Sequence, residues 1–285
     1  MIKVLKAGIY TTIQDLGRFG YRNQGVPVSG SMDSISASFA NALLNNNAND
    51  ALIEITLSGP KLLFTNATNI VLTGAEMSPQ LNEVPIQNYR VYKVVDGDVL
   101  SFGELKKGLR SYLAVHGGLD SETVLNSKSF YEDITSQWCL KKNDVLSFKS
   151  GIHEIENHES SIKHIHQFYD TEILEVFKGP DLELFSSVEQ EKIVSGSYTV
   201  SKDNNRMGYQ LEEISVVHSK SIITSPVLPG TIQLTPAGKL IILLKDAQTT
   251  GGYPRVLQLT EKSISILAQK NVGDKLYFDL VPTRY

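Results

Sequence analysis

The chain has 285 residues, of which 41% are hydrophobic, and its formal net charge is −4. The apolar content suffices for one or two folded domains and argues against a disordered chain. The slightly acidic balance argues against nucleic acid as the main partner, because phosphate binding usually needs a basic face. The single cysteine excludes an intrachain disulfide and fits a reducing compartment.

No segment of the sequence has the pattern of a targeting or membrane segment. The N-terminus, "MIKVLKAGIYTT", lacks the long apolar core of a signal peptide. No apolar run approaches the roughly 20 residues that a membrane-spanning helix needs. We therefore expect a cytoplasmic protein that does not enter a membrane.

Most of the chain is predicted to form strands. Short runs rich in β-branched residues and bounded by Gly, Pro or Asp occur at 69–75, 111–118, 172–179, 239–246 and 255–260. The clearest helix is predicted over 33–44, where Ile35, Phe39 and Leu43 would form one apolar stripe and Asp33 would cap the N-terminus. Shorter helices are predicted within 180–193 and 261–270.

Weak repeats suggest a duplication. "GPKLLF" at 59–64 resembles "GPDLELF" at 179–185, and "NDVLSF" at 143–148 resembles "GDVLSF" at 97–102 and "GDKLYF" at 273–278. Two similar units would explain the repeats; the alternative is that Gly-Asp-x-Leu is a common signal for a turn followed by a strand. We predict an N-terminal segment with one helix at 1–55, β units at 56–150 and 171–285, and a linker at 151–170.

The predicted linker contains four of the six histidines: His153, His158, His164 and His166. Imidazole is a common metal ligand, but "HEIENH" misses the spacing of the helical zinc motif. We interpret these histidines as solvated linker residues and expect no metal site.

Two polar stretches stand out from the strands. "TTIQDLGRFGYRNQGVPVSGSMD" at 11–33 is punctuated by glycines, and a loop of this length is often functional. "KDAQTTGGYPRV" at 245–256 places Asp246 at the end of a predicted strand, followed by Gln248, whose amide suits an amide-like group, and by Gly251 and Gly252, whose N–H groups could form an anion-binding nest. Arg255 and Tyr253 could orient a carboxylate. A plain tight turn remains an equally open interpretation of the second stretch.

These stretches, together with "ALIEITLSGPKLLF", "LTGAEMSPQLNEVP", "DGDVLSFGELKKGLRSYLAVHGGLD" and "NRMGYQLE", span nearly the whole chain. Taken in their order along the chain, they resemble the biotin-dependent carboxyltransferase-like family, which includes the C subunit of 5-oxoprolinase, KipA and allophanate hydrolase subunit 2. The resemblance implies a mainly β fold of two cyclophilin-like β-barrel units with a few short helices.

The resemblance also implies partners and an activity. Family members act beside a KipI-like subunit, and in 5-oxoprolinase beside a LamB/YcsF-like subunit as well, in the ATP-dependent opening of 5-oxo-L-proline to L-glutamate. The sequence has no phosphate-binding loop, no dinucleotide fingerprint and no biotin-acceptor motif. We therefore expect a hydrolase subunit that is inactive alone and binds no cofactor by itself, while the complex uses ATP.

Two alternatives remain open. One is a carboxyltransferase component that moves a carboxyl group from carboxybiotin to a urea-like acceptor. The other is a KipA-like regulatory antagonist that binds a KipI-like kinase inhibitor. The absence of nucleotide and biotin motifs is compatible with all three functions, because each needs another protein.

By resemblance, the site residues come from three stretches. The candidates for catalysis are Asp15, Arg206, Asp246 and Gln248; the candidates for substrate binding are Gln14, Arg18, Met32, Asp33, Met207, Thr249, Thr250, Gly251, Gly252 and Tyr253. The arginines would bind a carboxylate or phosphate, Asp246 an N–H or a proton, and the glycine amides an oxyanion. The sequence has Lys128, Gln210 and Ala247 where arginine is common in the family; Lys128 keeps the positive charge of an arginine but not its bidentate geometry.

Overall fold

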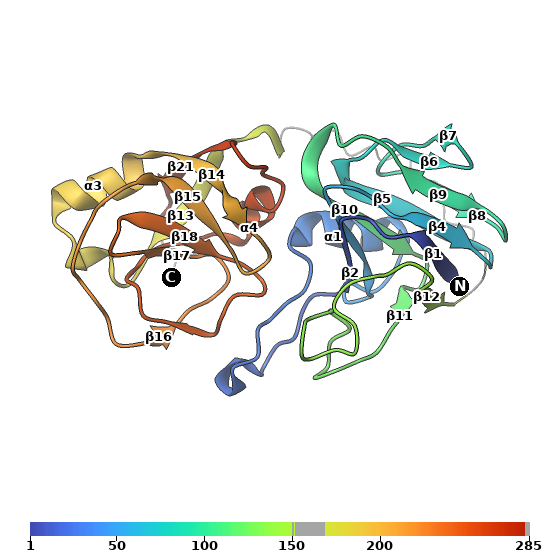
Figure 1. The fold of residues 1–285 in the computed structure, drawn as a ribbon, viewed down its shortest axis with the longest axis horizontal. Helices are drawn as coiled ribbons and strands as arrows, with labels where there is room; N and C mark the ends of the chain where they lie inside the picture. The colour runs from blue at the N-terminus through green and yellow to red at the C-terminus, as the bar shows by residue number, and fades with distance from the viewer. Residues whose placement is uncertain (150, 152–168, 283–285) are drawn as a thin grey trace. The chain divides into compact units, whose positions relative to one another are not determined.

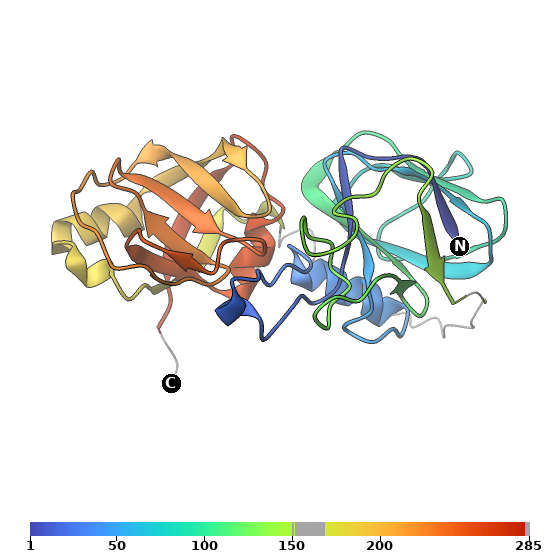
Figure 2. The same cartoon turned by 60° about the horizontal axis from the view of Figure 1, so that its bottom comes forward.

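The computed structural model describes residues 1–149, 151 and 169–282. In this part of the chain nearly all regular structure is β, with three short α-helices, so the predicted mainly β fold is confirmed. The chain divides into two compact units, which Figures 1 and 2 draw as ribbons from two sides.

The observed division differs from the predicted boundaries. The first unit comprises 1–18 and the described residues from 29 to 151, and the second comprises 19–28 and 169–282. The predicted N-terminal segment 1–55 is therefore not a separate part, because its strands pair with strands of the first unit. Only its segment 19–28 belongs to the second unit, so the chain passes from one unit to the other more than once.

The first unit consists of two antiparallel sheets. One has seven strands in the order β11-β12-β1-β4-β9-β6-β7, and the other has five in the order β2-β3-β10-β5-β8. Helix α1 (Ser34–Leu43) packs beside β5 and β10. The strands are β1 (Ile2–Lys6), β2 (Tyr10–Gln14), β3 (Leu52–Thr56), β4 (Lys61–Phe64), β5 (Thr68–Glu76), β6 (Pro79–Leu81), β7 (Val84–Pro85), β8 (Val91–Val94), β9 (Val99–Phe102), β10 (Lys107–Val115), β11 (Leu119–Asp120) and β12 (Val145–Phe148).

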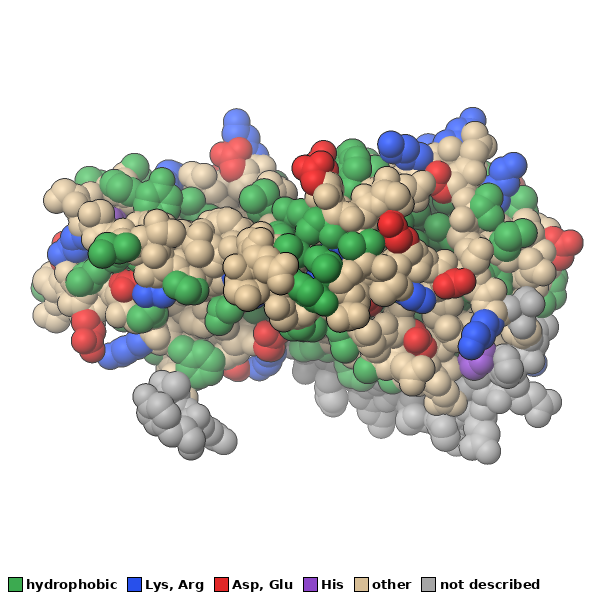
Figure 3. Space-filling view, turned by 90° about the horizontal axis from the view of Figure 1, so that it is seen from below, with side chains coloured by type: hydrophobic (Ala, Val, Ile, Leu, Met, Phe, Trp, Pro, Cys, Tyr) green, Lys and Arg blue, Asp and Glu red, His purple; other side chains and the backbone are tan. Residues whose placement is uncertain are grey.

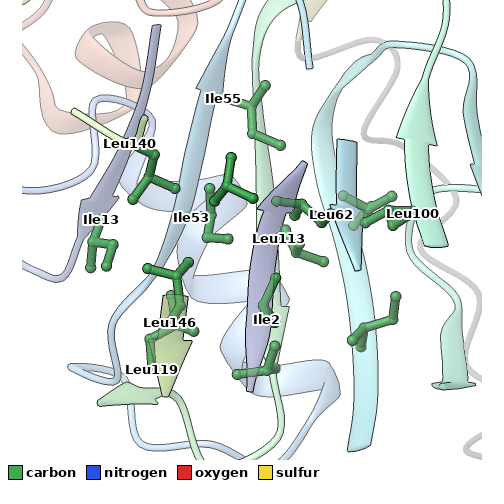
Figure 4. Packing of buried hydrophobic residues seen from close by; sticks show 14 of the residues in the cluster. Ile2, Ile13, Ile53, Ile55, Leu62, Leu100, Leu113, Leu119, Leu140 and Leu146 are labelled. Atoms are coloured by element: carbon green, nitrogen blue, oxygen red, sulfur yellow. The ribbon is translucent and has the colours of Figure 1, made fainter. Parts of the chain in front are cut away.

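The two sheets of the first unit share one hydrophobic core. Alternate residues of each strand point inward, as the period of two in a β-strand requires. Ile2 comes from the seven-stranded sheet and Ile53 and Leu113 from the five-stranded sheet, and all three are buried in the same cluster (Figure 4). The predicted first barrel is thus observed as two sheets that enclose a common core.

Helix α1 buries a different face from the predicted one. Asp33 caps it as expected, since its side chain accepts a hydrogen bond from the Ser36 N–H. However, the buried positions are Ser36, Ala37, Ala40 and Asn41, whereas Phe39 of the predicted apolar stripe is exposed. The prediction was wrong because small side chains let the helix approach the sheet closely, and the polar ones are bonded: the Ser36 hydroxyl donates to Asp33.

The second unit contains a closed barrel in the strand order β13-β20-β17-β18-β15-β14-β21, in which β13 and β21 pair in parallel and close the ring. A separate two-stranded ribbon joins β16 to β19. The elements are β13 (Ile173–Lys178), η2 (Leu182–Leu184), α3 (Ser187–Ser195), β14 (Ser197–Asn204), β15 (Gly208–Ile214), β16 (Ser225–Pro226), β17 (Thr231–Leu234), β18 (Lys239–Leu243), β19 (Thr250–Gly251), β20 (Arg255–Leu259), α4 (Glu261–Leu267) and β21 (Lys275–Leu280).

The repeated Gly-Asp-x-Leu sequences share one local structure. The carboxylates of Asp98, Asp144 and Asp274 each accept a hydrogen bond from the backbone N–H three residues earlier, at 2.8, 2.7 and 2.8 Å. The residue before each aspartate has a positive φ, which suits Gly97 and Gly273. A strand follows each turn, so this repeat is a turn-plus-strand signal that occurs in both units.

The other repeat does not correspond to a common structure. "GPKLLF" forms strand β4, whereas "GPDLELF" contains the 3₁₀ helix η2. The duplication inferred from this pair of sequences is therefore not seen at these positions.

On the face drawn in Figure 3, acidic and basic side chains are interspersed with hydrophobic ones among the described residues. The four histidines interpreted as solvated, His153, His158, His164 and His166, lie outside the described residues, as does most of the predicted linker 151–170.

Candidate functional site

The turn that follows strand β18 carries the predicted catalytic aspartate. Asp246 forms a two-pronged ion pair with Arg206, which lies in the turn between β14 and β15: Arg206 Nε donates to Oδ2 at 2.7 Å and Nη2 to Oδ1 at 3.2 Å. The two side chains are only 5% and 9% exposed. The backbone ties the same two turns together, since the Asp246 N–H donates to the Arg206 carbonyl at 3.0 Å. The structure thus brings these two predicted residues into direct contact.

This pairing constrains the chemistry of both groups. A buried charge is costly unless it is paired, so each side chain neutralises the other. The pair is therefore suited to fixing the turn that precedes Gln248, and a catalytic role for either residue stays a prediction.

The loop 248–253 has a fixed backbone. Strand β19, within the loop, pairs with β16. The Thr249 carbonyl accepts a hydrogen bond from the Val227 N–H at 3.1 Å, and the Tyr253 carbonyl accepts one from Gln233 Nε2 at 3.2 Å. The backbone of residues 249–251 and of Tyr253 is therefore held from outside the loop.

The side chains of the same loop are available. Gln248 and Thr250 are exposed, and Tyr253 is 43% exposed. Within the described residues, none of the side chains of Gln248, Thr249, Thr250 and Tyr253 forms a hydrogen bond. If the stretch were only a turn, we would expect these polar groups to bond to the loop's own backbone. A fixed backbone whose polar side chains form no hydrogen bond with the described residues favours the interpretation as a binding site.

The two glycines of the loop differ. A Cβ on Gly251 would lie 2.5 Å from Gln233 Nε2, so a larger residue here would have to displace the Gln233 side-chain amide. A Cβ on Gly252 would meet no atom within 4 Å. Neither glycine has a positive φ, so the pair does not adopt the alternating conformation of the anion-binding nest that the sequence suggested.

Arg255 bonds to other residues of the second unit rather than facing a ligand. Its Nε and its backbone N–H both donate to Asp181 Oδ2, at 2.8 and 2.9 Å, and Nη1 donates to the Pro226 carbonyl at 3.1 Å. Partial burial opposes ionisation of Asp181, but the hydrogen bonds and charge of Arg255 outweigh it, so the pKa of Asp181 is lowered. The suggested role of Arg255 in orienting a ligand carboxylate is therefore replaced by an internal ion pair.

The first unit holds a second group of predicted residues around Asp15. This carboxylate, 4% exposed, accepts hydrogen bonds from the hydroxyls of Ser127 and Ser129 at 2.7 and 2.6 Å and from the backbone N–H groups of Lys128 and Gly17 at 2.6 and 2.8 Å. Four donors occupy a buried carboxylate, so Asp15 fixes the loop 127–129 against the end of β2.

Arg18 holds the same loop from another side. Its Nε donates to the Val124 carbonyl at 3.1 Å and its Nη2 to the Ser129 carbonyl at 2.8 Å, and the residue is fully buried. Lys128, which replaces a common family arginine, donates from Nζ to the Leu119 carbonyl at 3.0 Å. Here, too, the charged groups bind the chain itself.

The remaining predicted residues of the first unit are buried as well. Gln14 Nε2 donates to Thr12 Oγ1 at 3.1 Å, while its Oε1 has no hydrogen-bond partner among the described residues. The Met32 N–H donates to Glu54 Oε2 at 2.8 Å, and the Asp33 N–H to the Tyr112 hydroxyl at 2.8 Å. Full burial, reinforced by the charge of Glu54, raises the pKa of Tyr112 well above its usual value, so its hydroxyl keeps its proton and donates to Glu54.

The predicted site residues therefore fall into two groups, one in each unit. Sequence reasoning missed the residues that support them: Gln233, Glu54, Tyr112, and Arg22 from the loop 19–28, whose Nη2 donates to the Val227 and Thr249 carbonyls. Arg22 lies inside the glycine-punctuated stretch, so an extended search of that stretch could have found it. Nothing in the sequence marks the other three, because their partners are distant along the chain.

The described residues contain no cluster of three side chains able to hold a metal ion, and no helix with the length and apolarity needed to cross a membrane. Cys139 is partly exposed, and desolvation raises the pKa of its thiol, which disfavours a reactive thiolate.

The chain belongs to the family of the carboxyltransferase domain, subdomain A and B, whose model matches residues 24–280. It is 31% identical to the C subunit of 5-oxoprolinase from Escherichia coli, over 98% of this chain and 90% of that protein. It is also 31% identical to the C subunit of 5-oxoprolinase from Haemophilus influenzae, over 99% of this chain and 91% of that protein.

Solved structures show the same fold. The crystal structure of the protein TTHA0988 matches with a TM-score of 0.84 and 25% identity, over 98% of this chain and 55% of that chain. The crystal structure of the urea amidolyase of K. lactis matches with a TM-score of 0.86 and 27% identity, over 99% of this chain and 19% of that chain. The present chain thus spans about half or less of these solved chains.

Proposed function

We propose that this chain is the C subunit of an ATP-hydrolysing 5-oxoprolinase complex, in which it helps to open 5-oxo-L-proline to L-glutamate. The support is the 31% identity to two proteins of that name over nearly the full length of both chains. Water adds across the lactam C–N bond, so that one ring bond breaks and a carboxylate and an ammonium form.

The exposed polar side chains of the loop 248–253 support a binding site for the substrate at this loop. A lactam presents a planar amide with one donor and one acceptor, and the side-chain amide of Gln248 can meet both. Gln248 and Thr250 are exposed, and their side chains form no hydrogen bond within the described residues. Since the loop backbone is already fixed, little ordering would be needed when the substrate binds.

The proposal includes partners. A KipI-like and a LamB/YcsF-like subunit would supply the ATP chemistry, because the sequence of this chain has no phosphate-binding loop. The chain would bind no cofactor of its own, would be inactive alone, and would work in the cytoplasm. The two bacterial relatives are called subunits, which supports an assembly of more than one chain.

A second function is favoured by one comparison. The match to urea amidolyase supports a carboxyltransferase component, in which another protein would present carboxybiotin to this chain and urea would accept the carboxyl group. Urea, like the lactam, is a planar amide, so the same Gln248 side chain could bind it. The two functions therefore share a site and differ in their partners.

The test is reconstitution with defined partners. The purified chain alone is expected to form no glutamate and no ADP from 5-oxo-L-proline and ATP, whereas the chain with its KipI-like and LamB/YcsF-like partners forms both. Robust activity of the single chain would contradict the need for partners. Carboxylation of urea when biotin carboxylase and biotin carrier are added, without lactam hydrolysis by the first mixture, would replace the proposal with the second function.

A further inference from the structure

Arg22 makes a contact that no predicted role accounts for. Its Nη2 donates to two backbone carbonyls of the second unit, that of Val227 and, at 3.4 Å, that of Thr249. The segment 19–28 that carries it belongs to the same unit, although it lies in sequence between β2 and α1. Arg22 therefore touches the backbone of the candidate loop without being part of it.

The two carbonyls lie at one end of a small ribbon. The Val227 N–H itself donates to the Thr249 carbonyl at 3.1 Å, and strands β16 and β19 pair immediately beside this bond, with Pro226 opposite Thr250. Arg255 binds the neighbouring Pro226 carbonyl. Arg22 and Arg255 thus bind two consecutive carbonyls, those of Val227 and Pro226, and of these two arginines only Arg22 also bonds to the loop 248–253.

Arg22 is itself held in place. It begins the 3₁₀ turn Arg22–Gln24, and the turn closes with Gly25 in the left-handed conformation, whose N–H donates to the Arg22 carbonyl at 3.0 Å. A glycine suits this position because φ is +82°. The guanidinium is partly buried, and desolvation lowers the pKa of Arg22. The side chain therefore projects from a closed turn rather than from a free loop.

A two-stranded ribbon is marginally stable by itself. The ribbon β16–β19 has two residues in each strand, so bonds at its ends decide how well it is ordered. Gln248 directly precedes Thr249, the residue whose carbonyl Arg22 binds. A shift of the Thr249 backbone consequently shifts the Gln248 side chain.

We propose that Arg22 is a positioning residue: it fixes the Val227–Thr249 end of the ribbon and so sets where the side chains of Gln248 and Thr250 meet a planar amide substrate. This inference rests on the proposed function for its effect on rate. The ordering of the loop by Arg22 is inferred only from the hydrogen bonds of Arg22 to the Val227 and Thr249 carbonyls and does not depend on the proposed function.

The first experiment measures order without activity. Amide hydrogen exchange of the full-length chain is compared for wild type, Arg22→Ala, Arg22→Lys and the matched control Arg90→Ala, an exposed arginine of the first unit. Arg22→Ala is expected to speed exchange at Val227 and at 249–252 while leaving the barrel strands β17 and β18 unchanged. Unchanged exchange at these amides overturns the proposal. A variant that fails to fold is recognised by fast exchange throughout the barrel, and Arg22→Lys then carries the test.

The second experiment measures rate in the reconstituted complex. Arg22→Ala is expected to lower kcat for 5-oxo-L-proline by about 10- to 100-fold with a smaller change in KM, because misplacement by about 1 Å costs rates of that order. Added guanidinium at millimolar concentration should restore part of kcat and part of the exchange protection in Arg22→Ala, but should change neither in Arg90→Ala. A loss of activity caused by general destabilisation of the chain would not be rescued in this way.

The outcomes separate the two proposals. Faster loop exchange with an unchanged kcat overturns the positioning role while leaving the proposed function intact. A wild-type complex that does not act on 5-oxo-L-proline removes the proposed function, and the exchange and guanidinium results then decide by themselves whether Arg22 orders the loop.

Discussion

The surroundings of Asp15 and of Gln248 show two different uses of polar residues. Asp15 is buried and accepts four hydrogen bonds from the chain itself, while Gln248 is exposed and its side chain forms none within the described residues. Both residues come from the motifs that carry the family resemblance. The contrast shows that membership of such a motif does not separate residues that shape a loop from residues that meet a ligand.

The two kinds of residue are distinguished by whether their polar atoms already form hydrogen bonds within the protein. A buried carboxylate with four donors has little capacity left for a substrate, so its removal should affect folding. An exposed amide on a fixed backbone contributes little to folding, so its removal should affect binding or rate. The contrast predicts effects of decreasing size for substitutions at Asp15, Gln248, Gly251 and Asp181.

Asp15→Ala is expected to destabilise the first unit by about 3–5 kcal/mol, because it leaves two buried hydroxyls and two backbone N–H groups without their acceptor. Thermal melts of the full chain, followed by a signal from the first unit, measure the effect. The control is Asp120→Ala, whose carboxylate is 82% exposed. A wild-type melt with lost activity in Asp15→Ala would show that this carboxylate serves a ligand after all.

Gln248→Ala is expected to lower kcat of the assembled complex on the order of 10²-fold while changing stability by less than about 1 kcal/mol. The reason is that in the proposed function its amide would bond to the substrate, while it bonds to nothing in the described part of the protein. Steady-state turnover beside a thermal melt measures both quantities, and Gln87→Ala, an exposed glutamine of the first unit, serves as control. If turnover stays at the wild-type level with partners bound, the loop is only a turn.

The adjacent glycines make a matched pair within the loop. Gly251→Ala is expected to cost about 1–3 kcal/mol, because its Cβ would press on Gln233, whereas Gly252→Ala should stay within about 0.5 kcal/mol of wild type. Denaturant unfolding of the two variants measures the difference. Equal stabilities would mean that Gln233 moves aside, and the loop would then be less firmly held than the hydrogen bonds indicate.

The smallest effect is expected at Asp181, which pairs with Arg255. The folded pKa of Asp181 is lowered from 3.8, so the pair stabilises the fold fully above that pH and loses its contribution as the pH falls through the folded value. Asp181→Asn is expected to cost about 1 kcal/mol at neutral pH, since both side chains are partly exposed. The melting temperatures of the wild type and of Asp181→Asn should converge in acid. A difference that persists there would contradict the stabilising role of the Asp181–Arg255 pair.

Much of the fold could be read from local sequence. The β-branched runs became β5, β10, β13, β18 and β20, and helices formed at the three predicted places, because strand and helix patterns are local properties. The aspartate turns were recognisable too, since the carboxylate bonds within three residues of its own position. Local chemistry also placed Asp33 at the N-cap of α1.

Other features depended on residues that are distant along the chain. The stripe through Phe39 was a reasonable helix face, but the face that became buried was chosen by the sheet against which α1 packs. The assignment of 19–28 to the second unit and the contact of Arg22 with Thr249 likewise join positions far apart in the sequence, 227 residues in the case of that contact. No local pattern encodes such a partner.

The sequence by itself determined the strands, the turns, the family motifs and the residue types in the candidate loop. Only the tertiary structure decided which of those polar side chains are already bonded. Asp246 and Arg206, 40 residues apart, neutralise each other, and Asp181 occupies Arg255, whereas Gln248 and Thr250 remain exposed. The physical reason is that a hydrogen bond depends on distance and direction in space, and the folded backbone sets both.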